Sequence, residues 1–203
     1  MKVRKSGKLV HGVGINDADY LTREYHYVHG KRVQVWICPY YSKWKDMLRR
    51  CYYNDPKNRN RTYRDCTVCK EWLTFSNFKK WMQVQEWEGN DLDKDLLKVG
   101  NKIYCPDYCI FICRKINSFI GDSAANRGEC MIGVCYFKKN NKFVARCNNP
   151  FMCETEYLGI FDTEPEAHLA WKARKHYWAC QLADSEYCTD PRLAEALRTR
   201  YVD

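Results

Sequence analysis

The sequence predicts an α+β protein made of two small modules in series. Residues 92–119 follow the order strand, loop, strand, helix, and residues 133–183 follow the order of three strands and one helix. Between them, residues 122–130 are small and polar, which is typical of a linker. The chain of 203 residues is long enough for two modules with separate cores. We therefore expect an extended segment at 1–37, a first module at 38–121, a linker at 122–130 and a second module at 131–203.

The composition favours a cytoplasmic protein with a polyanionic partner. Hydrophobic residues make up 45% and aromatic residues 15% of the chain, which excludes a disordered protein. Lys and Arg number 34 against 25 Asp and Glu, and the resulting charge of +9 suits binding to phosphates. The 13 Cys are scattered without a signal peptide, which predicts reduced thiols in a cytoplasm, that of a host cell if a phage encodes the chain. No apolar run is long enough to span a membrane, so we expect no membrane contact.

Two helices are expected at the start of the first module, with a basic loop between them. Pro39 can open a helix whose apolar stripe includes Trp44 and Leu48, and a second helix is expected to begin near Thr74 or Ser76. Residues 57–64 carry four positive charges and no acidic residue. This loop is either a phosphate clamp or a solvated loop. The candidate DNA-binding residues in it are Arg59, Arg61 and Arg64.

The second half of the first module is expected to be a hairpin followed by a helix. Leu92 to Lys98 and Ile103–Tyr104 have the pattern of two strands, joined by a hairpin loop at residues 99–102. Ile110 to Phe119 has the pattern of a helix. A unit of this kind can hold a divalent cation between a carboxylate of the first strand and an Asn of the helix, where the cation steadies the leaving oxygen of a phosphodiester.

The residues of this unit resemble the HNH endonuclease family, in the form of phage homing endonucleases. The resemblance covers about residues 38–121 and includes the motifs Leu92-Asp93-Lys94-Asp95, Pro106-Asp107-Tyr108-Cys109 and Ile112 to Asn117. It implies a hydrolase that nicks or cuts double-stranded DNA with Mg²⁺ or Mn²⁺. It assigns Asp93 and Asn117 as metal ligands, Lys94 to the position of the general base, and Asp107 as a ligand or a residue that supports one.

Lys94 departs from the family, in which this position is a histidine. A lysine with its usual pKa of about 10.4 is a poor base at neutral pH. Cleavage would then need a Lys94 with a lowered pKa, a tyrosine such as Tyr104, or a metal-bound hydroxide without a protein base. The alternative is a catalytically inactive DNA-binding protein of phage origin that serves as a regulator or an anti-defence factor. A third class is an inhibitor whose basic surface binds an acidic protein partner.

The cysteines of the first module allow two interpretations. Cys66-x-x-Cys69 is one half of a structural zinc site, and many HNH proteins have a second pair on the helix. Here Cys113 occupies the first position of that second pair but Ile116 occupies the other, so Cys109 or Cys105 would have to substitute. The candidate zinc ligands are therefore Cys66, Cys69, Cys109 and Cys113. Otherwise these thiols pack in the core beside aromatic rings.

The second module has the pattern of a small sheet braced by a helix. Strands are expected at 133–137, 142–147 and 156–161, and Thr163 with Glu166 forms a capping box that opens the long helix. A last helix is expected to begin at Asp190-Pro191. The hairpin can direct basic side chains toward phosphates and base edges, and Tyr136 toward a sugar or a thymine methyl group. The candidate residues are Tyr136, Lys138, Lys139, Lys142 and Arg146.

Residues 131–183 also resemble the Apetala-type (ethylene-responsive) DNA-binding domain. The pieces that carry the resemblance are Ile132-Gly133-Val134, Lys142 to Arg146, Tyr157 to Phe161 and Thr163 to Ala167. It implies a three-stranded sheet that lies in the major groove and one helix that supports it. The first strand carries Cys135 and Phe137 where the family has arginines, so base specificity is not carried over. Without that resemblance, the hairpin would be a solvated basic surface of an ordinary α+β domain.

Overall fold

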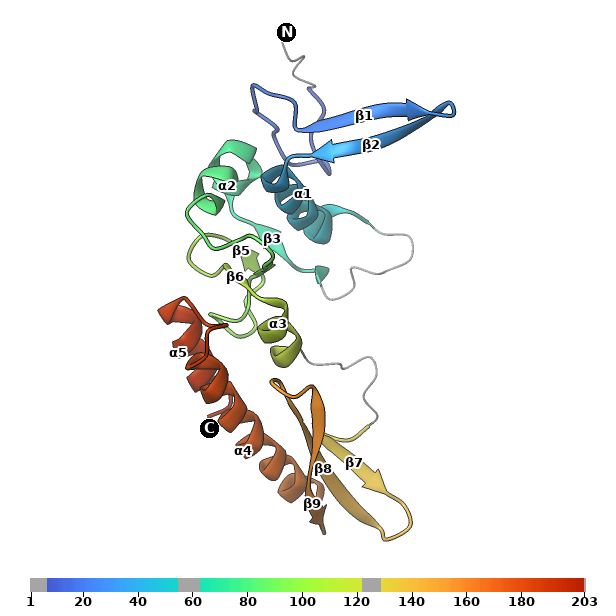
Figure 1. Ribbon diagram of the computed structural model, residues 1–203, viewed down its shortest axis with the longest axis vertical. Helices are drawn as coiled ribbons and strands as arrows, with labels where there is room; N and C mark the ends of the chain where they lie inside the picture. The colour runs from blue at the N-terminus through green and yellow to red at the C-terminus, as the bar shows by residue number, and fades with distance from the viewer. Residues whose placement is uncertain (1–6, 55–62, 122–128, 203) are drawn as a thin grey trace. The chain divides into compact units, whose positions relative to one another are not determined.

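The protein is a mixture of helices and short β-sheets, which confirms the α+β class. The computed structural model describes residues 7–54, 63–121 and 129–202. The chain divides into two compact units, residues 1–111 and residues 112–203 (Figure 1). The division therefore falls within the segment 38–121 that the sequence assigns to one module. Most of the expected linker, residues 122–128, lies outside the described residues.

The first unit consists of a β-ribbon, two helices and several short strands. Its elements are β1 (Arg23–Val28), β2 (Lys31–Ile37), α1 (Pro39–Tyr52), β3 (Thr67–Val68), η2 (Lys70–Leu73), α2 (Phe75–Met82), β4 (Asp91–Asp93), β5 (Ile103–Tyr104) and β6 (Ile110–Ile112), whose last residue begins the second unit. Both expected helices are confirmed. The core is aromatic: Trp44 of α1 lies 5.4 Å from the ring of Phe75, and its Nε1 donates a hydrogen bond of 2.7 Å to the Trp72 carbonyl.

The strands of the expected hairpin pair with other partners. β5 pairs with β3 in parallel, and β4 pairs with β6 instead of β5. The first strand ends early because Asp93 Oδ1 accepts hydrogen bonds from the backbone N–H groups of Asp95 (2.9 Å) and Leu96 (2.7 Å), which closes a turn. The expected hairpin between Leu92–Lys98 and Ile103–Tyr104 is therefore wrong.

The helix that was expected to begin at Ile110 begins four residues later, as α3 (Arg114–Ile120). Residues 110–112 form β6 instead, and all three side chains of this strand are buried. Isoleucine and phenylalanine fit a buried strand well, because branched and aromatic side chains pack closely on a pleated surface. The order strand, strand, helix is retained, but with β4 and β6 as the paired strands.

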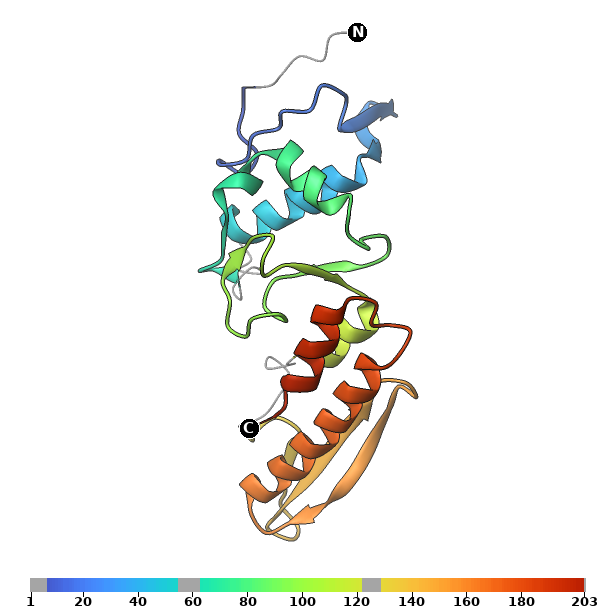
Figure 2. The ribbon, with the colours of Figure 1, turned by 90° about the vertical axis from the view of Figure 1, so that its left-hand side faces the viewer.

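The second unit is a three-stranded antiparallel sheet with a long helix along one face. After α3 come β7 (Val134–Phe137), β8 (Lys142–Asn149), β9 (Glu154–Phe161), α4 (Glu164–Ala183) and α5 (Pro191–Thr199). The strand order is β7-β8-β9, and α4 lies along the sheet (Figure 2). Val134, Ala145 and Ala167 form the buried contact between the sheet and α4.

The capping predictions for this unit are confirmed. Thr163 accepts a hydrogen bond from the Glu166 N–H, and the Glu166 carboxylate accepts one from the Thr163 N–H, so both halves of the capping box are present. Asp190 accepts a hydrogen bond of 2.8 Å from the Arg192 N–H at the start of α5. Both devices satisfy backbone donors that the first turn of a helix would otherwise leave without partners.

Candidate functional site

The face of the sheet away from α4 is the first candidate surface. Cross-strand pairing places Cys135 opposite Val144, Val144 opposite Ile160, and Arg146 opposite Tyr157. These residues alternate with the ones that pack against α4, so their side chains project from the other side. We call this surface the outer face. Its residues are Cys135, Phe137, Lys142, Val144, Arg146, Tyr157 and Ile160.

The outer face carries cations and aromatic rings, whereas the acidic residues of these strands lie on the helix side. Glu156 faces α4, where it accepts a hydrogen bond of 3.2 Å from Trp178 Nε1 and forms an ion pair of 3.4 Å with Arg174. Glu154 alternates onto the same side. Tyr157 and Phe137 remain 61% and 41% exposed. The outer face is therefore a partly apolar surface without a carboxylate among its own side chains, and Asp162 pairs with Lys142 at its edge.

The predicted DNA-binding residues of this unit do not all share that surface. Tyr136 lies opposite Phe143, whose ring is 5.3 Å away and belongs to the core under the sheet, and its hydroxyl donates to Asn141. Tyr136 therefore lies on the other face from Arg146. Lys138 and Lys139 are exposed in the turn between β7 and β8, and Lys142 forms an ion pair of 2.5 Å with Asp162.

The basic loop of the first unit can be described only in part. Arg59 and Arg61 lie outside the described residues. Arg64 is exposed, and the phosphate clamp stays a prediction.

The predicted catalytic strand ends in a turn built around a buried lysine. Lys94 is only 6% exposed, and its Nζ donates hydrogen bonds to Asp95 Oδ2 at 2.9 Å and to the Asn101 carbonyl at 3.2 Å. Asn101 returns a hydrogen bond of 2.6 Å from its Nδ2 to the Lys94 carbonyl. These hydrogen bonds link Asp95 to Asn101 through Lys94, so Lys94 acts as a structural cross-link within residues 94–101.

The electrostatics of this turn do not give Lys94 the lowered pKa that a general base at neutral pH would need. Burial alone would lower the pKa of Lys94, but its hydrogen bond and charge interaction with Asp95 outweigh burial and raise the pKa. Burial also raises the pKa of Tyr104 far above its usual value, even beside Arg50. Lys94 therefore stays charged and Tyr104 stays neutral near pH 7. Neither is suited to take a proton from water.

The proposed metal ligands belong to two different units, and divalent-cation binding by them stays a prediction. Asp93 lies in the first unit and has one carboxylate oxygen already bonded to two backbone donors, with the Lys94 ammonium next in the chain. Burial raises its pKa, with a further rise from Asp95. Asn117 lies half-buried on α3 in the second unit, and Asp107 is exposed. We derive no cleavage step through a metal from these residues.

The cysteines of the first unit are mostly packed in its core. Cys66 and Cys109 are 2% and 0% exposed and belong to the aromatic cluster, whereas Cys113 lies in the second unit with its Sγ 3.9 Å from the Tyr187 carbonyl. Burial raises the pKa of Cys66, and raises that of Cys69 to about 11. Among the described residues no group of three or more His, Cys, Asp or Glu could hold a metal ion. This arrangement suits packed thiols, and zinc binding stays a prediction.

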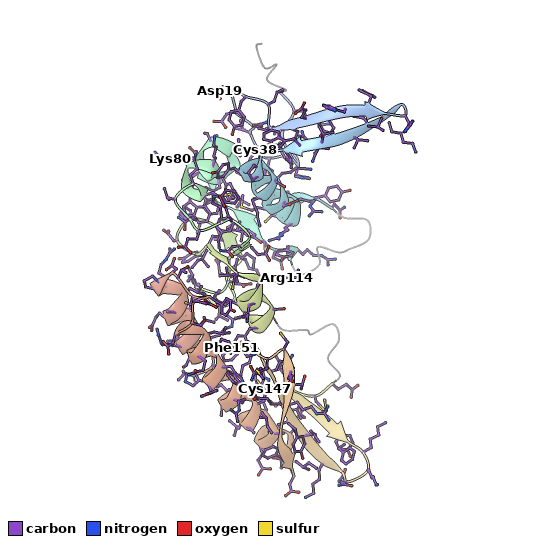
Figure 3. The ribbon with its side chains drawn as sticks, viewed as in Figure 1. Asp19, Cys38, Lys80, Arg114, Cys147 and Phe151 are labelled. Carbon is purple, nitrogen blue, oxygen red and sulfur yellow. The ribbon has the colours of Figure 1, made fainter. Side chains whose placement is uncertain are left out.

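The second unit contains a cationic pocket that the sequence patterns did not predict. The pocket has a volume of about 550 Å³ and is lined by Arg114, Lys115, Asn148 and Lys175, among others (Figure 3 labels Arg114). Lys175 is 8% exposed, and its Nζ donates a hydrogen bond of 2.6 Å to the Phe119 carbonyl. A detectable signal exists, since Lys175 lies four residues after Trp171 and four before Ala179 on the buried stripe of α4.

Lys175 makes the stability of this unit depend on pH. Burial lowers its pKa from 10.5 to about 8, a fall that Cys147 opposes and Arg200 adds to. Between these two values the unfolded chain binds more protons, so the penalty for burying the ammonium is complete below about pH 8 and fades as the pH rises. We expect Lys175→Met to gain stability relative to the wild type at about pH 7, and this advantage to shrink by roughly 2 kcal/mol at about pH 10. Chemical denaturation of both proteins at the two pH values measures it, and a difference that does not vary with pH would contradict it.

Comparisons with known proteins add no family to these observations. No family model matches the chain, and neither a curated protein nor a solved structure does. In the described part of the chain, none of the helices has the length and apolar character needed to cross a membrane.

Proposed function

We propose that this protein binds double-stranded DNA and that the outer face of its second unit contacts the DNA. The observation that carries the proposal is the segregation of charge on the strands: Arg146 lies on the outer face without a strand carboxylate beside it, whereas Glu154 and Glu156 face α4, and the one carboxylate at the edge, Asp162, is paired with Lys142. A surface that approaches phosphates must exclude carboxylates, because like charges repel at contact distance. The resemblance of residues 131–183 to the Apetala-type domain supports the same surface.

The distribution of charge along the chain assigns different contributions to the two units. Residues 1–111 contain 21 Lys and Arg against 13 Asp and Glu, whereas residues 112–203 contain 13 against 12. Long-range attraction to a polyanion follows net charge. The first unit therefore contributes most of the long-range attraction, which is shared among many charges, and the outer face contributes a small number of fixed contacts. The motifs of the sequence predict that DNA binding resides mainly in residues 131–183, and the charge distribution adds a contribution from the first unit.

Replacement of Arg146 tests the outer face. We expect Arg146→Ala to weaken binding of a DNA duplex about fivefold or more, because one charged contact is worth about 1–3 kcal/mol. Fluorescence anisotropy at several salt concentrations measures this, and log affinity should fall linearly against log salt. The matched control is Lys80→Ala, which removes one exposed positive charge from α2 (labelled in Figure 3).

The control separates a contact from a general charge effect. Lys80→Ala should change the affinity less than about twofold. Equal losses in the two variants, or wild-type binding that ignores salt, would overturn the assignment of the outer face. Both variants should keep the melting temperature of the wild type, because both side chains are exposed.

Metal-assisted endonuclease activity is the second candidate function. The observation that favours it is the pairing of β4 with β6 directly before α3, which retains the strand, strand, helix order of an HNH unit and carries Asp93 and Asn117. The geometry around Lys94 argues against it, since the residue at the base position is a buried cross-link. We therefore place the inactive DNA-binding protein ahead of the endonuclease, which reverses the order of preference taken from the sequence.

A further inference from the structure

The β-ribbon formed by β1 and β2 has more exposed apolar and aromatic surface than a solvated hairpin needs. Tyr27 is 76% exposed, and Val28, Val35 and Trp36 are each close to half exposed. Figure 1 shows the ribbon projecting beyond the helices of its unit. An isolated two-stranded hairpin is barely stable in water. A ribbon kept in this form therefore suggests a partner that covers it.

The turn and the base of the ribbon keep it in one register. His29 and Gly30 both have positive φ, at 50° and 72°, and Val28 pairs with Lys31, so the strands are joined by a two-residue turn of the type that matches strand twist. At the base, the Cys38 N–H donates to the Thr22 carbonyl at 2.9 Å. The two faces of the ribbon are therefore well defined.

One face of the ribbon combines arginines with tyrosines. Tyr25 pairs with Gln34 and Tyr27 pairs with Arg32, and alternation adds Arg23 to the same side. We call this surface the Arg–Tyr face. Its residues are Arg23, Tyr25, Tyr27, Arg32 and Gln34.

The arginines of this face are oriented by tyrosine rings. The guanidinium of Arg32 lies 3.8 Å from the centre of the Tyr25 ring, and that of Arg23 lies 5.3 Å from the centre of the Tyr41 ring. No described carboxylate forms an ion pair with Arg23 or Arg32. Stacking on a ring leaves the N–H groups at the edge of a guanidinium available and reduces the entropy lost when they bind a ligand.

The acidic residue of the ribbon lies on the opposite face. Glu24 pairs with Trp36, and its carboxylate contacts His26 Nε2 at 3.2 Å. Alternation along β1 places Glu24 on this side, and a β-bulge between Glu24 and Tyr25 shifts Trp36 to the same side. The Arg–Tyr face is therefore positive and free of carboxylates, which complements a polyanion.

We infer that the Arg–Tyr face of the β1–β2 ribbon is a second DNA-binding surface that enters the major groove of a duplex. The inference rests on the proposed DNA binding but concerns a different surface. The major groove of B-form DNA is wide enough for a two-stranded ribbon, and arginine is the residue that most often contacts guanine there. The six residues of β1 extend about 20 Å, enough to follow the groove over several base pairs. The deep, narrow major groove of duplex RNA does not admit such a ribbon.

Replacement of Arg32 in the full chain tests this inference. We expect Arg32→Ala to weaken binding of a fluorescent DNA duplex about tenfold and to reduce the slope of log affinity against log salt by about one. Arg32→Lys should lose several-fold, because lysine keeps the charge without the planar stacking on Tyr25. The matched control is Lys31→Ala, which removes the same charge from the neighbouring residue on the opposite face and should change the affinity less than about twofold.

Three comparisons can overturn the inference: Arg32→Ala against Lys31→Ala, duplex DNA against other nucleic acids, and Arg32→Ala against Arg146→Ala. Equal losses in Arg32→Ala and Lys31→Ala would show a general charge effect. Binding of duplex RNA or single-stranded DNA as tight as that of duplex DNA, with the same dependence on Arg32, would exclude insertion into the major groove. A protein that responds to Arg146→Ala and not to Arg32→Ala would retain the proposed function and lose only the ribbon. Absence of any DNA binding would overturn both.

Discussion

Replacement of Gly133 by alanine is expected to unfold the second unit or leave it barely stable. Gly133 has a φ of +81°, which a residue with a Cβ adopts only with strain, and an added Cβ would lie 2.1 Å from two atoms of the Trp171 ring. That ring cannot move aside easily, because it stacks on His168 at 5.2 Å and meets Tyr201 edge-on at 6.0 Å. Strain and overpacking together should cost about 3–5 kcal/mol.

The control for this prediction is a glycine with the same conformation and free space around it. Gly30 has a φ of +72° and no atom within 4 Å of an added Cβ, so Gly30→Ala should lose only about 1 kcal/mol. Thermal unfolding followed by circular dichroism compares the two variants. A loss in Gly133→Ala no larger than that in Gly30→Ala would show that the Trp171 ring does not hold the sheet against α4.

The parts of the fold that local signals determine could be predicted from the sequence. The capping box of Thr163 and Glu166 identifies the start of α4, because both partners lie within one turn of the helix. The alternation of apolar and polar residues along 142–147 identifies β8, because this pattern too is contained in a short segment. The pairing of β4 with β6 and of β3 with β5 could not be predicted, since each joins segments distant in sequence. A short run such as Ile110–Ile112 fits a helix or a strand equally well.

The candidate sites could likewise be predicted only where local sequence determines them. The sequence indicated Arg146 as a binding residue, and the outer face includes it. The role of Lys94 could not be predicted, because one of its hydrogen-bond acceptors, the Asn101 carbonyl, lies seven residues away in the sequence. The Arg–Tyr face follows simple alternation along β1 and β2, but the bulge at Glu24 and Tyr25, which a sequence pattern does not predict, removes Trp36 from it. Without the bulge, simple alternation would place Trp36 beside Gln34.

We expect neither the wild type nor Lys94→His to nick supercoiled DNA with Mg²⁺ or Mn²⁺. A histidine at position 94 has a suitable pKa of about 6.5 for a general base, so the family pattern alone would predict a gain of activity. In this structure the side chain at position 94 is directed to Asp95 and the Asn101 carbonyl, and it is buried. A shorter imidazole cannot bond both partners, and we expect the variant to lose about 2 kcal/mol of stability.

Asp93→Ala and Asp107→Asn distinguish a structural turn from a metal site. Asp93→Ala should lower stability, because Asp93 Oδ1 holds the N–H groups of Asp95 and Leu96, whereas the exposed Asp107 should tolerate its replacement. Agarose gels with each metal report nicking, and circular dichroism reports folding. Nicking by the wild type that Asp93→Ala abolishes in a folded protein would establish the endonuclease. Loss of stability without nicking in any variant would mean that Lys94 and Asp93 serve the fold and would contradict the endonuclease.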